Sequence, residues 1–407
     1  MYKRLLSSLL IVFLLAGCAV ESVPSAAPSE SVPGAAAPES EPPPASPSEP
    51  EVEPSEQPDP KTLTVEALLS AMTLEEKVGQ LFFVRCPASQ AAEKVGKYHL
   101  GGYILFDRDF RNAAGNWLTR EQFTEKLAAY QAAADVPLLI GVDEEGGTVV
   151  RASRNPNLFE TVRQSPQKVY GRGGLDAIKQ DTLLYSGGLL ELGINVNLAP
   201  VADVSTNRTD FIYDRAFGQD GAATADYIEA AVSAANQARY EPGDGTVWAI
   251  GSVLKHFPGY GNNADTHTGV AIDRRPYEQF EAEDFLPFRA GIRAGAGGVM
   301  VSHNVVVSMD PDLPASLSPE VHRVLREELG FEGVIMTDDL AMDAVDAYGS
   351  AAVLAVQAGN DLIVTTDFEE QIPLVIDAVK SGTLSEDTID QAVRRVLGWK
   401  YDLGLLG

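Results

Sequence analysis

An aspartate and a histidine two residues apart form the clearest candidate for proton transfer in this sequence. Asp265 and His267 end the segment 255–267, which is rich in glycine and asparagine and can move a catalytic group into a site. In an extended stretch, side chains at this spacing point the same way. A carboxylate beside an imidazole stabilises its charged form and fixes its tautomer, which suits proton transfer near neutral pH. The alternative is a polar surface turn.

A second candidate is the carboxylate of Asp338, which directly follows the apolar run Gly333–Thr337. A carboxylate at the carboxyl end of a buried strand lies where a nucleophile or an electrostatic stabiliser belongs in a barrel enzyme. The alternative for Asp338 is a helix N-cap. Its neighbour Asp339 is better explained as such a cap, or as a group that orients Asp338.

A third candidate segment begins at Asp143, continues through two glutamates and two glycines, and reaches Arg151. A carboxylate and a forked guanidinium group can together bind the vicinal hydroxyls of a sugar. The alternative is a turn between a strand and a helix, with solvated charges.

Several other classes of site are excluded by the sequence. It contains no phosphate-binding loop, no dinucleotide-binding glycine pattern and no His-Glu-x-x-His motif. The five histidines show no metal-ligand spacing, so we expect neither a metal nor a cofactor. The adjacent acids Asp338 and Asp339 are weak evidence for a cation site. The formal net charge of −27 argues against a nucleic-acid partner, which would require clustered lysine and arginine.

The elements that must position these residues are short apolar strands. Eight runs rich in valine, isoleucine and leucine lack strict alternation, as expected of strands buried on both faces. They lie near Leu81–Val84, Gly102–Phe106, Leu138–Val142, Ile194–Leu198, Ser252–Lys255, Gly298–Ser302, Gly333–Thr337 and Asp361–Val364.

Helical patterns separate most of these runs. Thr73 and Glu76 form a capping box, and Ser385 is a plausible N-cap for a last helix. The clearest helices are predicted at Arg120–Ala133, Tyr227–Ala238 and Glu386–Lys400. The alternation favours an α/β fold, a (β/α)₈ barrel in a single catalytic domain, over an open doubly wound sheet. Polar residues follow strand after strand, which supports the barrel: Asp143, Asp203, Lys255, His256, His303 and Asp338.

The N-terminus has the pattern of a targeting segment. Two basic residues precede an apolar run that ends at Ala16 and is too short to span a membrane comfortably. Residues 15–18 resemble a bacterial lipobox, which implies that residues 1–17 are a signal peptide and that Cys18 is lipidated. Two acyl chains there would anchor the protein stably. The alternative is an ordinary secretory signal.

Composition divides the remainder of the chain. Residues 18–61 are dominated by proline, serine, alanine and glutamate, cannot bury a core, and are expected to form a disordered linker. Residues 62–407 are expected to form the folded domain. The second cysteine, Cys86, lies in an apolar run and is expected to be a small buried side chain.

Together these segments resemble glycoside hydrolase family 3, specifically its single-domain β-N-acetylhexosaminidase branch, here as a bacterial lipoprotein. The similarity covers nearly all of residues 64–402. The segments that resemble the family are Met72–Phe82, Val142–Gly147, Lys255–Gly259, Pro314–Ser318 and Thr337–Met342.

The resemblance implies a barrel fold and retaining chemistry. Asp338 would be the nucleophile that forms a covalent glycosyl-enzyme, and His267 the general acid and base, with Asp265 as its partner. Retaining enzymes usually use two carboxylates, so a histidine here replaces one of them. Contacts to the first sugar would come from Asp143, Arg151, Arg215, Lys255 and His256.

The sequence departs from the family pattern at two places. Tyr260 stands where a histidine is expected, and the loop before Asp265 is one residue shorter, which bears on loop closure and on the acid/base assignment. Thr148 stands where an arginine is expected after the glycines, which bears on substrate binding.

The resemblance predicts an enzyme that releases terminal β-linked N-acetylglucosamine from peptidoglycan fragments or chitin-like oligosaccharides. It would be a lipid-anchored, extracytoplasmic monomer. A β-glucosidase or β-xylosidase of this family usually draws its acid from a second domain, for which the chain to Gly407 leaves no room. A phosphorylase remains open, because a neutral imidazole repels phosphate less than a carboxylate does. A sugar-binding lipoprotein without catalysis is disfavoured, because every catalytic position is filled.

Overall fold

The computed structural model describes residues 59–266, 269–342, 345 and 348–406. The chain divides into two compact units, Met1–Glu56 and Gln57–Gly407, and all described residues belong to the second. The predicted signal peptide and Cys18 lie outside the described residues, as does nearly all of the predicted linker.

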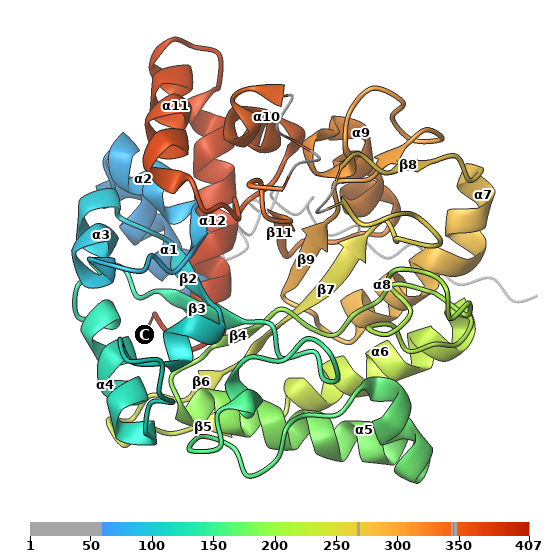
Figure 1. The fold of residues 1–407 in the computed structure, drawn as a ribbon. Helices are drawn as coiled ribbons and strands as arrows, with labels where there is room; N and C mark the ends of the chain where they lie inside the picture. Colours follow the sequence, from blue (N-terminus) through green and yellow to red (C-terminus); the bar gives the residue numbers. More distant parts are fainter. Residues whose placement is uncertain (1–58, 267–268, 343–344, 346–347, 407) are drawn as a thin grey trace, which may run out of the picture. The chain divides into compact units, whose positions relative to one another are not determined.

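The centre of the unit is a parallel sheet of seven strands in the order β1-β2-β3-β4-β7-β9-β11, with helices around it (Figure 1). Each strand overlaps one of the predicted apolar runs, so seven of the eight strand predictions are confirmed. The strands are β1 Phe83–Arg85, β2 Gly102–Leu105, β3 Leu139–Val142, β4 Val196–Asn197, β7 Gly251–Phe257, β9 Gly298–Val301 and β11 Val334–Thr337.

The eighth predicted run, Asp361–Val364, lies between β11 and β1. On one side the backbone N–H of Thr337 donates to Leu362 over 3.2 Å. On the other side the N–H of Ile363 donates to Leu81 over 2.7 Å. This run therefore bonds to both edges of a curled parallel sheet, through isolated bridges and not as a regular strand.

The helices lie mainly in the connections between these strands, as predicted. They are α1 Pro60–Ala71, α2 Leu74–Gln80, α3 Ala91–Tyr98, α4 Arg120–Gln131, α5 Pro166–Glu191, α6 Gly221–Ala235, α7 Tyr277–Gln279, α8 Phe285–Arg293, α9 Pro319–Arg323, α10 Ala351–Ala358, α11 Phe368–Lys380 and α12 Glu386–Asp402. The capping box at Thr73 and Glu76 is confirmed at the start of α2, and the N-cap Ser385 is confirmed at α12. None of the described helices is both long and apolar enough to cross a bilayer.

The interior of the curled sheet is apolar. One buried cluster contains side chains from all seven strands and from Leu362 and Val364 of the eighth run. Its base is closed by Trp399 of α12. The ring packs against Gly251 and Gly297, where an added Cβ would lie 2.4 Å and 2.1 Å from ring atoms. Glycine at these two positions lets the last helix close the amino end of the sheet.

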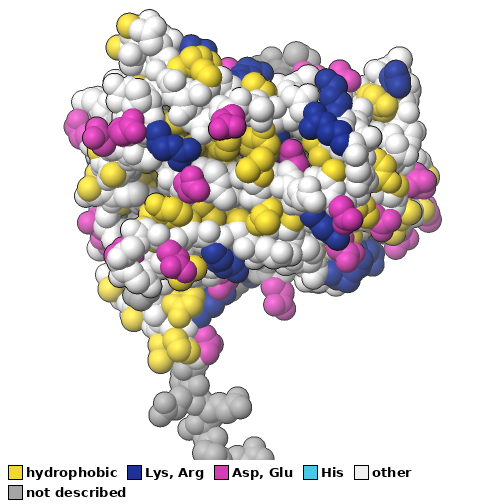
Figure 2. All heavy atoms as spheres, turned by 90° about the horizontal axis from the view of Figure 1, so that it is seen from below, with side chains coloured by type: hydrophobic (Ala, Val, Ile, Leu, Met, Phe, Trp, Pro, Cys, Tyr) yellow, Lys and Arg dark blue, Asp and Glu magenta, His cyan; other side chains and the backbone are white. Residues whose placement is uncertain are grey.

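Two short strand pairs lie outside the main sheet and were not predicted. The strands β5 (Arg239–Tyr240) and β6 (Trp248–Ala249) pair antiparallel, and β8 (Ile272–Asp273) pairs parallel with β10 (Val305–Val306). A strand of two residues is too short to show a recurring pattern of apolar residues in the sequence. Figure 2 shows one face of the molecule, on which acidic and basic side chains are interspersed.

Candidate active site

A cavity of about 300 Å³ lies at the carboxyl ends of the strands. Its volume is within the range of small-molecule sites. Each of the seven strands, or the residue that directly follows it, contributes to the lining, as does the eighth run, and this is the arrangement expected of a barrel active site. The lining residues are Arg85, Ile104, Phe106, Asp143, Glu145, Val149, Arg151, Leu198, Arg215, Lys255, His256, Met300, Asp338, Asp339, Met342 and Val364.

Six of the residues singled out from the sequence are therefore brought together here. They are Asp143, Arg151, Arg215, Lys255, His256 and Asp338. Their positions at strand ends or in the following loops agree with the prediction. Their roles in binding and catalysis remain proposals.

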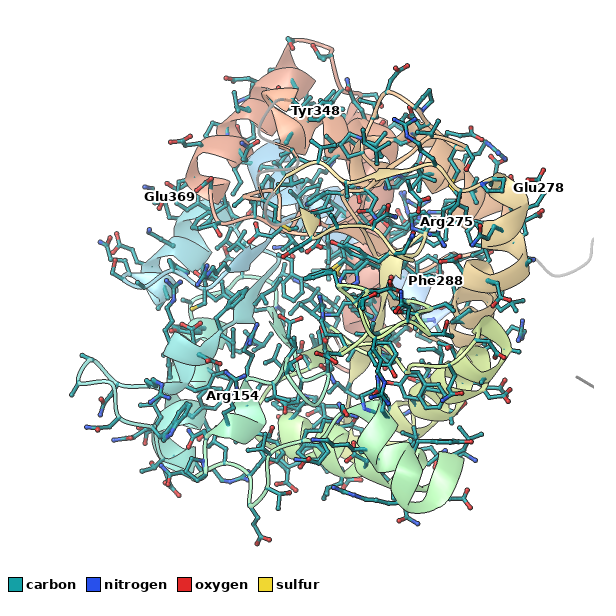
Figure 3. The ribbon with its side chains drawn as sticks, turned by 45° about the vertical axis from the view of Figure 1, so that its right-hand side comes forward. Arg154, Arg275, Glu278, Phe288, Tyr348 and Glu369 are labelled. Atoms are coloured by element: carbon teal, nitrogen blue, oxygen red, sulfur yellow. The ribbon has the colours of Figure 1, made fainter. Side chains whose placement is uncertain are left out.

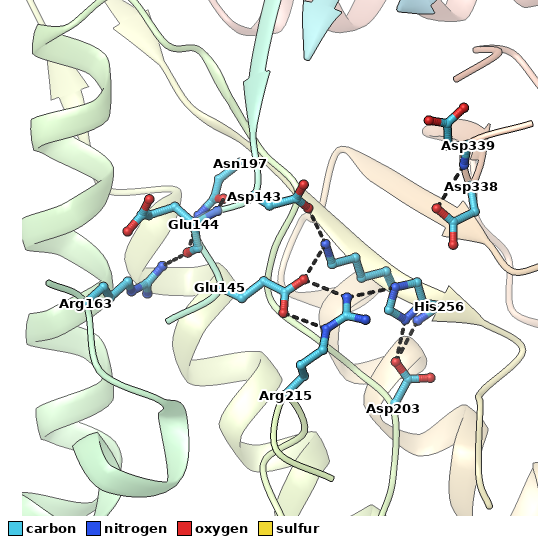
Figure 4. A network of polar contacts seen from close by, with 11 residues as sticks. Asp143, Glu144, Glu145, Arg163, Asn197, Asp203, Arg215, His256, Asp338 and Asp339 are labelled. Carbon is cyan, nitrogen blue, oxygen red and sulfur yellow. Dashed lines mark hydrogen bonds and ion pairs between the residues drawn. The ribbon is translucent and has the colours of Figure 1, made fainter. Parts of the chain in front are cut away.

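A buried ion-pair network occupies one wall of the cavity (Figure 4). Lys255 lies 2.6 Å from a carboxylate oxygen of Asp143 and 2.6 Å from one of Glu145. Arg215 binds Glu145 through two nitrogens, at 2.8 and 3.0 Å. Only 2% of the Lys255 side chain and 2% of the Glu145 side chain is exposed. Buried charges are tolerated at such positions because each has opposite charges in contact.

The network holds Glu145 and Lys255 in their charged forms. Burial alone would raise the pKa of Glu145, but the charges of Arg215 and Lys255 outweigh it and hold the pKa below the ordinary value. Burial alone would lower the pKa of Lys255, but the charges of Asp143 and Glu145 raise it above the ordinary value. The wall thus offers the Lys255 ammonium group and the Glu145 carboxylate, whose charges are fixed across the neutral range.

His256 is held as one tautomer by its two neighbours. Its Nδ1 lies 2.7 Å from Oδ2 of the fully buried Asp203, and its Nε2 lies 3.2 Å from a nitrogen of Arg215. A guanidinium group can only donate, so Nε2 must accept and Nδ1 must bear the proton. These two contacts fix the orientation of the imidazole ring.

Asp338 lies on a separate element from this network, directly after β11 (Figure 4). Its backbone N–H donates to Val301 over 3.0 Å, which continues the pairing of β11 with β9. Its Oδ1 accepts a 2.9 Å hydrogen bond from the backbone N–H of Asp339. The side chain is half-buried and lines the cavity, so one carboxylate is fixed by the backbone at the mouth of the sheet.

The turn after Asp338 is itself supported from two sides. Nε2 of the buried His303 donates to the carbonyl oxygen of Asp339 over 3.0 Å. The Asp339 carboxylate accepts from the backbone N–H of Ala341 over 3.0 Å. The Asp339 side chain thus stabilises a local turn, and its backbone N–H orients the Asp338 carboxylate. This agrees with the second of the two roles considered for it, and among the described residues it caps no helix.

The loop after β7 is anchored at its base by Arg275 (Figure 3). Arg275 donates to the carbonyl oxygen of Gly259 over 3.1 Å and pairs with Asp284 at 2.8 Å. Its second partner, Asp273, also accepts from the side chain of Asn263 over 2.6 Å. The first half of this loop is thus tied to the body of the domain.

Tyr260, which stands where the family pattern predicts histidine, is buried in this loop. Its backbone N–H donates to Oδ1 of Asp203 over 2.8 Å, and its hydroxyl bonds to Thr266. Burial, and then the negative charge of Asp338, raise its pKa. Asp265 is half-buried and does not line the cavity, whereas His267 lies outside the described residues.

Sequence reasoning missed the roles of three residues. The sequence pattern places Glu145 in a turn and Asp203 after a strand, and it does not single out Arg85. The partners of Glu145 lie 70 and 110 positions away in the sequence, so no local pattern reveals them. A usable signal for Arg85 is its position immediately after the apolar run that became β1.

The neighbouring Glu144 supports the loop that leads to Arg151. Its buried carboxylate accepts the backbone N–H groups of Arg151 and Ala152 at 2.9 and 2.8 Å. The carbonyl oxygen of Glu144 accepts from Arg163, and its N–H donates to Asn197 over 3.0 Å. Figure 4 shows the contacts of Glu144 with Arg163 and Asn197 beside the ion-pair network.

One group of potential metal ligands occurs among the described residues. The ligand atoms of Glu76, His99 and Asp135 lie within 4.8 Å of one another. His99 precedes β2, so this group lies at the amino end of that strand and not at the cavity. The described lining of the cavity offers acids already bound to lysine, arginine or backbone, an arrangement that fits a carbohydrate better than a metal ion.

The family model described as glycosyl hydrolase family 3 N terminal domain matches residues 73–398. The β-hexosaminidase of Xanthomonas campestris pv. campestris (strain B100) is 34% identical over 309 residues, covering 74% of this chain and 87% of that protein. The β-hexosaminidase of Nitrosomonas eutropha is 35% identical over 277 residues, covering 65% and 73%.

Solved structures show the same likeness. A family 3 β-N-acetylglucosaminidase from Paenibacillus sp. str. FPU-7 superposes with a TM-score of 0.71 at 30% identity, covering 82% of this chain. This chain spans 63% of that protein's length. A β-N-acetylhexosaminidase from Beutenbergia cavernae superposes with a TM-score of 0.69 at 28% identity, covering 81% of this chain and 99% of the other.

Proposed function

This chain belongs to glycosyl hydrolase family 3, and from that premise we propose that it is a glycosidase that removes terminal β-linked N-acetylglucosamine. The observation that supports this most directly is the cavity itself. A backbone-fixed carboxylate, Asp338, shares it with a buried network of lysine, arginine and histidine. The curated relatives named β-hexosaminidase and the solved β-N-acetylglucosaminidase support the same activity.

In this proposal Asp338 attacks the anomeric carbon. The bond from that carbon to the leaving oxygen breaks, and His267 gives its proton to that oxygen. Water then attacks the same carbon, its proton passes to His267, and the bond to Asp338 breaks. Two displacements at one carbon give retention of configuration. Asp265 is the proposed partner of His267.

The remaining polar residues hold the sugar. Asp143 and the ammonium group of Lys255 supply an acceptor and a donor side by side, which suits vicinal hydroxyls. His256 and Arg215 extend this surface, and we propose Arg151 as a further contact. Because their charges are already paired within the protein, Lys255 and Arg215 can bind a neutral sugar without leaving an ion unpaired.

Three finer points complete the proposal. The run Asp361–Val364 closes the sheet into a (β/α)₈ barrel, as its hydrogen bonds to both edges suggest. The substrates are peptidoglycan fragments or chitin-like oligosaccharides. The protein is a monomer, anchored outside the cytoplasm through lipid on Cys18.

The activity is tested by hydrolysis of two aryl glycosides. We expect rapid cleavage of aryl β-N-acetylglucosaminide and slow cleavage of aryl β-glucoside. Asp338→Ala should lower kcat by several orders of magnitude, and added azide should restore part of the rate by occupying the vacated position and giving the α-glycosyl azide. The control Asp176→Asn, on an exposed acid of α5, should behave as the wild type. Equal rates on both glycosides, or an active Asp338→Ala variant, would overturn the proposal.

A further inference from the structure

One tyrosine connects the wall of the cavity with the loop that follows β7. Only 1% of Tyr260 is exposed, and its ring packs edge to face against the ring of His256, with 5.1 Å between the centroids. A second ring, that of Phe211, lies 5.7 Å from it. The backbone N–H of Tyr260 donates to Oδ1 of Asp203, the acid whose Oδ2 lies 2.7 Å from Nδ1 of His256. The position of the Tyr260 ring is therefore set by residues in and behind the cavity wall.

The hydroxyl group of Tyr260 contacts a later residue of the same loop. It is hydrogen-bonded to the hydroxyl group of Thr266, a side chain with no exposed surface. The residues between these two, 261–265, are all half-exposed or exposed. Arg275 holds the start of the loop through the carbonyl oxygen of Gly259, and the Tyr260 hydroxyl holds a point seven residues further on. The exposed part of the loop thus lies between two buried attachment points.

Thr266 stands in the sequence between the two residues proposed for proton transfer, Asp265 and His267. A general acid acts only within hydrogen-bond reach of the leaving oxygen, and a misplacement of about 1 Å can lower the rate by up to about a hundredfold. A buried and hydrogen-bonded residue restricts the positions that its two neighbours in the chain can adopt. The hydrogen bond of Thr266 is therefore located where proton transfer most needs a restraint.

A direct chemical role for the Tyr260 hydroxyl is disfavoured by its surroundings. Tyr260 is not among the residues that line the cavity, so its hydroxyl does not face the sugar there. Burial, and then the negative charge of Asp338, raise its pKa, so the hydroxyl keeps its proton throughout the neutral range. The contact with Thr266 is the interaction through which this group can influence the reaction.

We propose that Tyr260 is a positioning residue for proton transfer, and that it acts through its hydrogen bond to Thr266. This inference rests on the proposed function and adds to it a residue outside the cavity lining. A histidine, which the family pattern predicts at position 260, has no hydroxyl group with which to form this bond. The bond therefore belongs to this chain's own form of the loop.

The experiment compares leaving groups, using the full-length protein. Tyr260→Phe keeps the ring and removes the hydroxyl group. The substrates are the β-1,4-linked disaccharide of N-acetylglucosamine, whose leaving sugar needs a proton, and the 2,4-dinitrophenyl N-acetylglucosaminide, whose leaving group departs without one. We expect Tyr260→Phe to lower kcat/KM about tenfold on the disaccharide and less than about twofold on the dinitrophenyl glycoside, since kcat/KM includes only the steps up to departure of the leaving group. His267→Ala should show the same selectivity to a greater degree.

Variants of the partner show whether the hydrogen bond itself is responsible. Thr266→Val should cause the same selective loss, and Thr266→Ser, which keeps the hydroxyl group, should retain most of the activity. The double variant Tyr260→Phe/Thr266→Val should lose no more than either single variant, because both remove one bond.

The matched control is Tyr185→Phe on α5. Tyr185 is buried, and its hydroxyl group lies 3.0 Å from that of Thr161 in a second tyrosine–threonine pair. The variant should leave kcat/KM unchanged on both substrates. Thermal unfolding shows whether each variant is folded, and Thr266→Val decides the question if Tyr260→Phe does not fold.

Three outcomes would overturn the inference. They are equal losses on the two substrates, full activity of Tyr260→Phe on the disaccharide, and losses that add in the double variant. Equal losses would indicate that Tyr260 affects sugar binding through His256 and not proton transfer. Failure of the proposed function is distinct, because the wild type would then cleave neither substrate.

Discussion

At the scale of single residues, Glu145 is the acid that both Lys255 and Arg215 contact. We expect Glu145→Gln to lower the free energy of unfolding by about 3 kcal/mol, because Arg215 would lose its carboxylate while it remains buried. We also expect kcat/KM on aryl N-acetylglucosaminide to fall at least about tenfold, since the Lys255 ammonium group would shift toward Asp143. Denaturant unfolding and initial rates measure the two effects.

The matched control is Glu278→Gln, on an exposed glutamate of α7 that Figure 3 marks. It should change neither stability nor rate, because a single exposed charge contributes little. If Glu145→Gln were as stable and as active as this control, the network would not have the positioning role assigned to it.

The contacts of Glu145 and Asp203 could not be predicted from the sequence. Asp143 and Asp338 could be predicted because each directly follows an apolar run, and Lys255 because it ends one, so all three are expected near the carboxyl end of a strand. The contact of Asp203 with His256 joins residues 53 positions apart and exists only after the strands are aligned. The two residues of a long-range ion pair are not separated by any regular spacing, so a sequence pattern cannot identify them as partners.

At the scale of elements, a buried lysine links the last helix to the second. Lys400 of α12 is fully buried and donates to Gln80 of α2 over 2.7 Å. Burial lowers its pKa from 10.5 to about 7. The unfolded chain then binds more protons than the native protein between pH 7 and 10.5, so this residue makes stability rise with pH across that window.

Lys400→Met removes that contribution. We expect the difference in unfolding free energy, Lys400→Met minus wild type, to decrease by about 1.4 kcal/mol per pH unit between pH 7.5 and 10. Contributions of other groups cancel in the difference. Denaturant unfolding at several pH values measures it, and Lys61→Met, on a half-exposed lysine paired with Asp402, should show no such trend. If the unfolding free energies of Lys400→Met and of the wild type changed with pH in the same way, the assignment of a lowered pKa to Lys400 would be contradicted.

Elements were the best-predicted level of the structure. Seven strands overlap the predicted apolar runs, and the helices α4 and α12 match their predicted ranges to within two residues, whereas α6 begins six residues before the predicted start at Tyr227. Strand ends differ by one or two residues. The run Leu81–Val84 starts early because the buried end of α2 continues directly into β1. The eighth run forms only isolated bridges. The amino-acid composition of such a run is the same as that of a regular strand, so the sequence does not distinguish the two.

At the scale of the whole molecule, the proposed lipid anchor would place the catalytic unit at a membrane. Cells expressing the wild type with a labelled fatty acid should yield a labelled protein in the membrane fraction, and Cys18→Ser should abolish the label. Cys86→Ser is the matched control, because Cys86 is buried and burial raises the pKa of its thiol to about 12. A label retained by Cys18→Ser, or absent from the wild type, would refute the anchor.

The whole arrangement of strands serves one purpose in this account, which is to hold a nucleophilic carboxylate opposite a mobile proton donor. The most direct test is to trap the covalent intermediate with a 5-fluoro N-acetylglucosaminyl fluoride, which slows both displacements but keeps a good leaving group. Proteolysis and mass spectrometry of the trapped protein should place one added sugar on Asp338. An adduct on another residue, or turnover of the fluoride with no adduct at all, would contradict Asp338 as the nucleophile.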